Sequence, residues 1–299
     1  MPSSDAAAAG QAPECHFCSL CQAMAALRSA RPEAVEHLLK AGAELLLAAR
    51  ALLEGEAEVV VCDLRGFGAS DKHPAPPAEA YSAPAQARSV LGLVDELGLA
   101  KPVLAGYDIG SRIAQAAARA APGRVRALVT SPPMPGGGRR VLEPEAQREF
   151  WYQPFHALQL VEELLDGRPE AVRAYLRHFW SHWSGPGFEL DDRRLDHLTE
   201  VYAPPGAMTA SVAWYRAGSG MVAMSLAEQA PAPGDRIAVP MTVLWPEHDP
   251  LFPPAWSDRL GEFFAAVQVR HLAGVGHFTP VEAPGAFAAA IGRALGGDG

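Results

Sequence analysis

The chain has 299 residues and a formal net charge of −9. A chain of this length can bury a large core, so we expect one domain with an inserted subdomain rather than two independent domains. The acidic balance argues against nucleic acid and anionic membranes as partners, and no apolar run reaches the length of a membrane-spanning helix.

Residues 1–57 contain little that favours β-strands. Val35 is the only Val, Ile or Thr in this segment. From Pro32 to Leu53 the spacing of Val and Leu predicts a helix. We expect residues 1–31 to be largely disordered, so that 1–57 is an atypical, partly disordered segment with one helix.

The cysteines do not form a disulfide framework for a protein of this size. They are Cys15, Cys18, Cys21 and Cys62. The first three give two CxxC steps, but no fourth Cys lies nearby, so we predict no metal site. Residues 1–10 lack the basic and apolar regions of a secretory signal, and we expect a cytoplasmic protein.

Alternating strands and helices are predicted from residue 58. A short buried strand at Val59–Cys62 leads into a Gly-rich loop, Asp63–Asp71. A helix is predicted from Ala83 to Leu97 because Val and Leu recur on one face. A later strand is predicted at Val125–Val129.

Between that helix and that strand, an apolar strand runs into Gly106-x-Asp108-x-Gly110 and a helix starts at once. This arrangement is typical of a nucleophile elbow, in which a tight turn pushes one side chain above the sheet. We expect a Cβ at Gly106 or Gly110 to collide with the adjoining strand or helix.

The residue at the tip of this elbow is Asp108. A carboxylate that attacks a saturated carbon forms an ordinary ester, which water can cleave later. Asp108 therefore points to chemistry at C–O or C–halogen bonds. The alternative role is an Asp that only caps the helix.

The segment from about residue 135 to 231 is rich in aromatic and charged residues and has helical periodicity. Two aromatic stretches stand out, Phe150–His156 and Ala213–Ala217. They supply the candidate site residues of this segment, which are Tyr152, Phe155, His156, Trp214 and Tyr215.

Two further strands are predicted in residues 232–299. The first, Pro240–Trp245, is followed by Asp249, and the second, Val267–Leu272, is followed by His277. A carboxyl-terminal helix is predicted after Pro284.

The order Asp108, Asp249, His277, with each residue after a predicted strand, resembles an α/β-hydrolase of the epoxide hydrolase and dehalogenase branch. The resemblance implies an α/β fold with a central, mostly parallel sheet flanked by helices. It places the core in residues 58–134 and 232–299 and a helical cap in residues 135–231. It also implies Asp108 as nucleophile, Asp249 as the acid that orients the base, and His277 as the base that activates water. It implies no cofactor.

One feature of this family is missing. Its members usually carry early strands and a His-Gly-x-Pro loop, which supplies one oxyanion donor beside the N–H that follows the nucleophile, here Ile109. No His-Gly pair occurs before Cys62. We therefore expect the sheet to begin at Val59–Cys62 and the activity to be weak, since one lost donor typically costs ~10²–10³ in rate.

The resemblance leaves two substrate classes. Cap tyrosines of epoxide hydrolases protonate the epoxide oxygen; Tyr215 fits one such position, and Tyr152 and Phe155 both fit the other. Fluoroacetate dehalogenases instead place two arginines after the nucleophile, where this chain has Ile109 and Arg112.

The acid of those dehalogenases also follows the sixth strand, where this chain has Ser131. We favour epoxides over organohalides on these grounds. A dehalogenase and an impaired relative that only binds a small molecule remain the alternatives. The expected partner is thus a small molecule held by Arg112, Phe155, His156 and Trp214. The sequence is also compatible with a homodimer.

Overall fold

The computed structural model describes residues 59–296. The predictions made for earlier residues, namely disorder over 1–31, the helix from Pro32 to Leu53 and the absence of a metal at Cys15–Cys21, lie outside the described residues.

Four parallel strands form one sheet in the order β1-β2-β3-β4. They are β1 (Val103–Gly106), β2 (Ala127–Thr130), β3 (Met241–Pro246) and β4 (Val267–Leu272). Residues of β2 are buried throughout, and most of β3 is buried as well. Such continuously apolar strands are typical of a parallel sheet covered on both faces. The predicted parallel sheet is confirmed.

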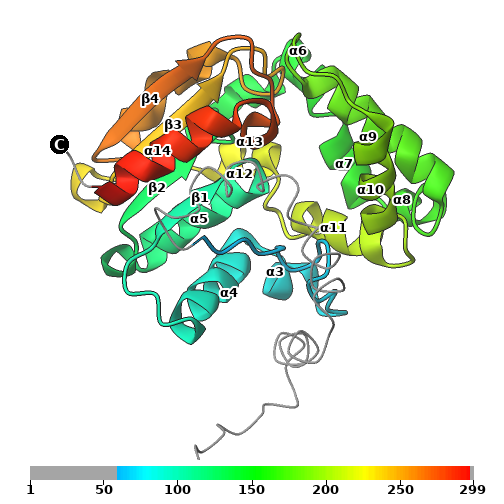
Figure 1. Ribbon diagram of the computed structural model, residues 1–299, viewed down its shortest axis with the longest axis horizontal. Helices are drawn as coiled ribbons and strands as arrows, with labels where there is room; N and C mark the ends of the chain where they lie inside the picture. The colour runs from blue at the N-terminus through cyan, green and yellow to red at the C-terminus, as the bar shows by residue number, and fades with distance from the viewer. Residues whose placement is uncertain (1–58, 297–299) are drawn as a thin grey trace, which may run out of the picture. The chain divides into compact units, whose positions relative to one another are not determined.

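Helices cover both faces of this sheet (Figure 1). On one face Leu128 of β2 packs with Ala114 and Ala118 of α5 (Ile109–Ala120). On the other face the next residue, Val129, packs with Phe287 of α14 (Pro284–Gly296), because successive side chains of a strand point to opposite faces. The other α-helices outside residues 131–240 are α3 (Pro77–Ala80), α4 (Ala83–Glu96) and α13 (Thr279–Glu282).

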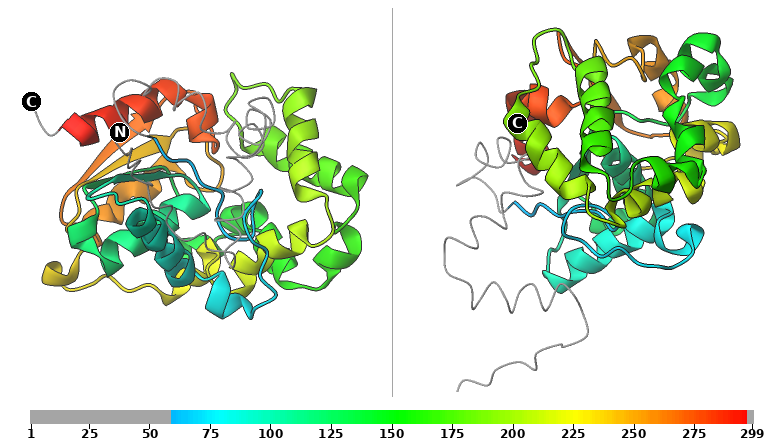
Figure 2. Two further views of the ribbon diagram at one scale, coloured as in Figure 1. Left: turned by 60° about the horizontal axis from the view of Figure 1, so that its bottom comes forward. Right: turned by 90° about the vertical axis from the view of Figure 1, so that its right-hand side faces the viewer.

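The chain between β2 and β3 is helical and has no strand within residues 131–240. Most of its α-helices lie together to one side of the sheet (Figures 1 and 2), whereas α12 lies among the helices at the sheet (Figure 1). They are α6 (Pro144–Glu149), α7 (Tyr152–Ala157), α8 (Leu160–Leu164), α9 (Pro169–Trp183), α10 (Asp192–Tyr202), α11 (Ala207–Arg216) and α12 (Met221–Ala227). This helical content is consistent with the cap expected at 135–231.

Short 3-10 turns complete the connections. They are η1 (Pro122–Arg124), η2 (Gly138–Leu142), η3 (Pro233–Asp235) and η4 (Pro254–Glu262). No helix within residues 59–296 is long and apolar enough to cross a membrane.

The predicted strand at Val59–Cys62 is wrong. These residues form no strand, and Val60 is 44% exposed. A strand requires a hydrogen-bonded neighbour, and no described residue pairs with this run. The described sheet therefore begins at β1.

Candidate functional site

Asp108 lies at the turn between β1 and α5 and has a backbone φ of 47°. No other non-glycine residue among the described ones has a positive φ. Such a conformation is costly for a residue with a Cβ and is found preferentially at functional sites. The Asp108 side chain makes no hydrogen bond that caps α5, which leaves its carboxylate available for other contacts.

Only one of the two glycines at this turn is needed for the close contact between the end of β1 and the start of α5. A Cβ on Gly106 would lie 2.7 Å from the carbonyl carbon of Gly110, so this part of the prediction is confirmed. A Cβ on Gly110 would meet nothing within 4 Å, so the expected collision there is wrong. The difference arises because Gly106 faces the backbone of α5, whereas Gly110 does not face β1.

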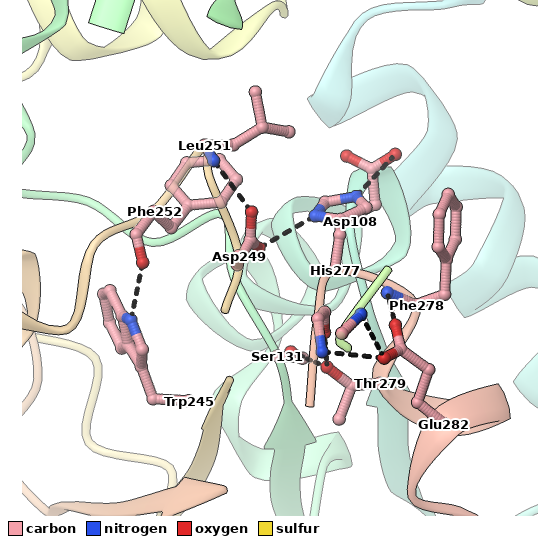
Figure 3. A network of polar contacts seen from close by, with 12 residues as sticks. Asp108, Ser131, Trp245, Asp249, Leu251, Phe252, His277, Phe278, Thr279 and Glu282 are labelled. Carbon is pink, nitrogen blue, oxygen red and sulfur yellow. Dashed lines mark hydrogen bonds and ion pairs between the residues drawn. The ribbon is translucent and has the colours of Figure 1, made fainter. Parts of the chain in front are cut away.

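The three residues of the predicted triad lie together above the carboxyl ends of the strands (Figure 3). His277 Nδ1 lies 2.9 Å from Asp249 Oδ2, and its Nε2 lies 3.8 Å from Asp108 Oδ2. The other oxygen of Asp249 accepts a hydrogen bond of 2.9 Å from the Leu251 N–H. Asp249 thus fixes the ring so that Nε2 points toward Asp108.

Two carboxylates control the protonation of His277. Burial works against the charged ring, but the negative charges of Asp249 and Asp108 and the hydrogen bond with Asp249 outweigh it and raise the pKa of His277 to about 10. His277 Nε2 is buried and makes no direct hydrogen bond within the described part of the chain.

Glu282 at the end of α13 holds the His277 loop against the loop after α9. Its Oε2 accepts hydrogen bonds of 2.8 Å from the N–H groups of Gly185 and Gly276, and its Oε1 accepts one of 3.0 Å from Phe278. These contacts fix the backbone on both sides of His277 (Figure 3).

Two tyrosines face Asp108 from the helical segment. Tyr152 of α7 and Tyr215 of α11 line, with Asp108, a small cavity of about 10 Å³. Their rings meet edge to face with centroids 5.6 Å apart. Burial raises the pKa of both phenols; the next cause is the charge of Asp108 for Tyr152 and the neighbouring Tyr152 for Tyr215. Both hydroxyls are therefore neutral hydrogen-bond donors at neutral pH.

Gln153 orients the hydroxyl of Tyr152. Its Nε2 donates to Tyr152 Oη over 3.2 Å, and its Oε1 accepts from the Val222 N–H over 3.0 Å. Tyr215 also hydrogen-bonds to Tyr152. With its oxygen used as an acceptor, the Tyr152 O–H proton is free to point at a ligand.

Arg112 lines the same cavity but already has a partner. Its Nη2 donates to Glu228, and the two side chains form an ion pair with exposed fractions of 3% and 24%. Arg112 was predicted to contact substrate. In the structure its guanidinium is paired with the Glu228 carboxylate, so a substrate group would have to compete with Glu228 for it. Trp214 lines the cavity too, and it packs with Ile113 and Ala117 of α5.

Phe155 and His156 do not reach this cavity. Phe155 packs with Val161 and Leu165 in a separate cluster of the helical segment. His156 Nε2 lies 2.7 Å from Tyr175 Oη, and burial followed by the charge of Arg216 lowers its pKa to about 3. Neither side chain lines the cavity beside Asp108, so contact with substrate stays a prediction for both.

Two further positions named from the sequence are Ile109 and Ser131. Ile109 is the first residue of α5, next to Asp108, and its role as an oxyanion donor stays a prediction. Ser131 is hydrogen-bonded to Thr279, with 2.7 Å between the two hydroxyls, and makes no hydrogen bond to the His277 ring. Within residues 59–296 there is no group of three or more His, Cys, Asp or Glu side chains that could hold a metal ion.

Sequence reasoning missed Gln153, Glu228 and Glu282. A weak signal existed for Gln153, which follows Tyr152 directly. The contacts of Glu228 with Arg112 and of Glu282 with Gly185 join residues more than 90 positions apart, and no local pattern predicts such contacts.

Comparison with known proteins gives a consistent picture. The sequence model of the alpha/beta hydrolase fold matches residues 43–284. A protein of Nostoc sp. PCC 7120 assigned to the alpha/beta hydrolases is 25% identical, with 84% of this chain and 86% of that chain covered and a TM-score of 0.73.

Two further solved structures bear the name epoxide hydrolase. A Klebsiella pneumoniae protein assigned as an epoxide hydrolase is 26% identical, covers 86% and 85% of the two chains, and has a TM-score of 0.68. The epoxide hydrolase of Bacillus megaterium, solved with an inhibitor, is 19% identical, with 85% of this chain and 89% of that chain covered and a TM-score of 0.70. At that identity the second likeness supports the fold alone.

Proposed function

Because the chain belongs to the α/β-hydrolase fold family, we propose that it is a hydrolase that opens epoxides to diols through an ester on Asp108. The observation that carries this proposal is the position of Asp108 between two kinds of group. A base, His277, lies on one side, and two neutral phenols, Tyr152 and Tyr215, lie on the other.

In the first step the Asp108 carboxylate attacks an epoxide carbon and the C–O bond of the ring breaks. The electron pair goes to the epoxide oxygen, which takes the proton of a tyrosine hydroxyl. Tyr152 is the better placed donor because Gln153 and Tyr215 occupy its oxygen as an acceptor. Such positioned proton donation is worth ~10²–10⁴-fold.

The second step needs His277 as a base. In the free enzyme the ring is held as a cation by two carboxylates. Esterification removes the charge of Asp108, so the pKa of His277 falls and the cation gives its proton to the tyrosinate left by the first step. The neutral ring then takes one proton from a water that attacks the ester carbonyl. The bond between the carbonyl carbon and the alkyl oxygen breaks, the second proton of that water goes to the departing alkoxide to complete the diol, and Asp108 returns as a carboxylate with His277 again a cation.

Isotope labelling tests the covalent step. Over many turnovers in H₂¹⁸O, label should enter the Asp108 carboxylate and then the product, and His277→Gln should accumulate the ester, seen as added mass on the Asp108 peptide. Label that enters the product but never Asp108 would mean that water attacks the epoxide directly.

Substrate preference is tested separately. Tyr152→Phe and Tyr215→Phe should each lower turnover of an aryl epoxide, whereas Tyr81→Phe should not, because Tyr81 is buried with its hydroxyl bonded to the His73 carbonyl. Halide release from fluoroacetate that exceeds diol formation would favour a dehalogenase. Loss of both activities with intact folding would favour a binding protein.

A further inference from the structure

Strand β1 has a free edge within residues 59–296. Its one described neighbour is β2, and the Gly106 carbonyl accepts a hydrogen bond of 3.1 Å from the Ser131 N–H on that side. Backbone groups of successive strand residues point to alternate sides. The N–H and C=O groups of Val103 and Ala105 therefore point away from β2, and no described residue pairs with them.

This free edge forms one wall of a groove of about 550 Å³. The run Val59–Cys62 also lines the groove, and its backbone groups make no hydrogen bond within the described part of the chain. Apolar side chains of two helices close the groove, namely Val90, Leu93, Val94 and Leu97 around α4 and Phe287, Ile291 and Leu295 of α14. Two unpaired backbone edges between apolar walls form a site for a further segment of polypeptide.

We propose that residues 43–58 of the same chain dock in this groove. The segment is joined directly to Val59, which lines the groove. The match to the family's sequence model begins at residue 43, so residues 43–58 share the family pattern and the preceding residues do not. The segment also supplies apolar side chains for the apolar walls, at Leu45, Leu46, Leu47, Leu52 and Leu53.

The length of the segment suits the groove. Strand β1 has four residues and spans roughly 13 Å at about 3.3 Å per residue. The segment 43–58 reaches roughly 24 Å as a helix and about twice that when extended. It can therefore follow β1 and still connect to Val59.

Docking would also change the surroundings of the nucleophile. One end of the groove is formed by Asp108 and Ile109, and the Asp108 side chain is 38% exposed. A segment in the groove would cover that side of the carboxylate and strengthen its interaction with His277, because charges interact more strongly away from water. The docking itself does not depend on the proposed epoxide chemistry.

Site-specific crosslinking of the full chain tests the proposal. We would replace Leu97, which lines the groove and is 43% exposed, with the photo-crosslinker p-benzoylphenylalanine. The matched control is the same replacement at Leu160 of α8, which is also 43% exposed but lies outside the groove. After illumination, peptides from residues 43–58 should be linked to position 97 and not to position 160.

Mixing ¹⁴N- and ¹⁵N-labelled protein shows whether the link is within one molecule. Links between differently labelled chains, or links from position 97 only to residues 1–42, would overturn the proposal. So would a position 97 that forms no link to residues 43–58.

Hydrogen exchange gives a second measurement that does not depend on crosslinking. Leu46→Glu combined with Leu47→Glu should speed amide exchange at Val103 and Ala105, which face the groove, at least several-fold. The amide of Leu104, which faces β2, should change little and serves as the internal control. Unchanged exchange at Val103 and Ala105 would contradict the docking.

Discussion

Gly185 and Gly276 are in direct backbone contact: a Cβ on Gly276 would lie 2.3 Å from the Gly185 nitrogen. Gly185 follows helix α9, and Gly276 immediately precedes His277. Both N–H groups donate to the same oxygen of Glu282. The helical segment between β2 and β3 is thereby fixed against the loop that carries the proposed base.

Replacing Gly276 with Ala should disturb this contact. The neighbouring atoms are backbone, which cannot move aside cheaply, so we expect a loss of about 1–3 kcal/mol in the free energy of unfolding. The proposed turnover should fall as well, since His277 is the next residue. Urea unfolding and steady-state kinetics measure both effects.

Gly285→Ala is the matched control for that substitution. A Cβ on Gly285 would meet nothing within 4 Å, and the residue lies in α14, where Ala is preferred over Gly. The free energy of unfolding of Gly285→Ala should stay the same or rise. An equal loss for both variants would show that the contact between Gly185 and Gly276 is unimportant.

Gln153→Glu should impair the proposed proton donor while it keeps the shape of the side chain. The new carboxylate can still accept from the Val222 N–H, but it can no longer donate to Tyr152. It would accept the Tyr152 proton instead and divert that proton from the substrate. We expect kcat for an aryl epoxide to fall roughly ten- to hundredfold, as one charge-assisted hydrogen bond is worth about 1.5–3 kcal/mol.

A double-mutant cycle separates this effect from a general loss of structure. In the Tyr152→Phe background, Gln153→Glu should cause little further loss of kcat, because the hydroxyl that it acts on is gone. Additive losses in the double variant would mean that Gln153 does not act through Tyr152.

The parallel sheet could be predicted from the sequence, and the three residues proposed as a triad could be named, because each follows from a local pattern; their catalytic roles stay predictions. A strand, a small residue and a helix in immediate succession place Asp108, and Asp249 and His277 each follow an apolar strand. The strand at Val59–Cys62 was predicted wrongly for a related reason. Its apolar composition favours a strand, but strand formation depends on a neighbour that local sequence does not reveal.

The cap side chains show the same limit. Tyr152 and Phe155 lie three residues apart, and sequence alone could not decide which of them faces Asp108. In the structure Tyr152 lines the cavity with Asp108 and Phe155 does not. Likewise, nothing near Arg112 in sequence indicates that Glu228 neutralises it.

Arg112→Met should destabilise the fold rather than weaken binding of a neutral substrate. The substitution leaves Glu228 without its cation in a site where it is only 24% exposed. Loss of one partner from a buried pair costs ~3–5 kcal/mol, and the partial exposure of Glu228 places the expected loss toward the lower end. Thermal and urea unfolding measure it.

The double variant Arg112→Met with Glu228→Gln is the control for this prediction. It removes both charges, so it should recover much of the lost stability, and KM for a neutral aryl epoxide should stay close to that of the parent. A large rise in KM with restored stability would show that Arg112 contacts the substrate after all.

The charge of His277 makes the stability of the protein depend on pH in a defined direction. Its pKa is raised from the ordinary 6.5 to about 10 in the folded protein. A group with a raised folded pKa contributes its full stabilisation below its unfolded pKa, and the contribution is lost as pH rises through the folded value. The difference in free energy of unfolding between the parent and His277→Gln should therefore be largest near pH 6 and shrink steadily toward pH 10.

Urea unfolding of both proteins at several pH values measures this difference. The control is His271→Gln, at an exposed position of β4, which should show no such trend. A difference that stays constant, or grows as the pH rises, would mean that His277 is neutral in the free protein and that the carboxylates of Asp249 and Asp108 do not hold it as a cation.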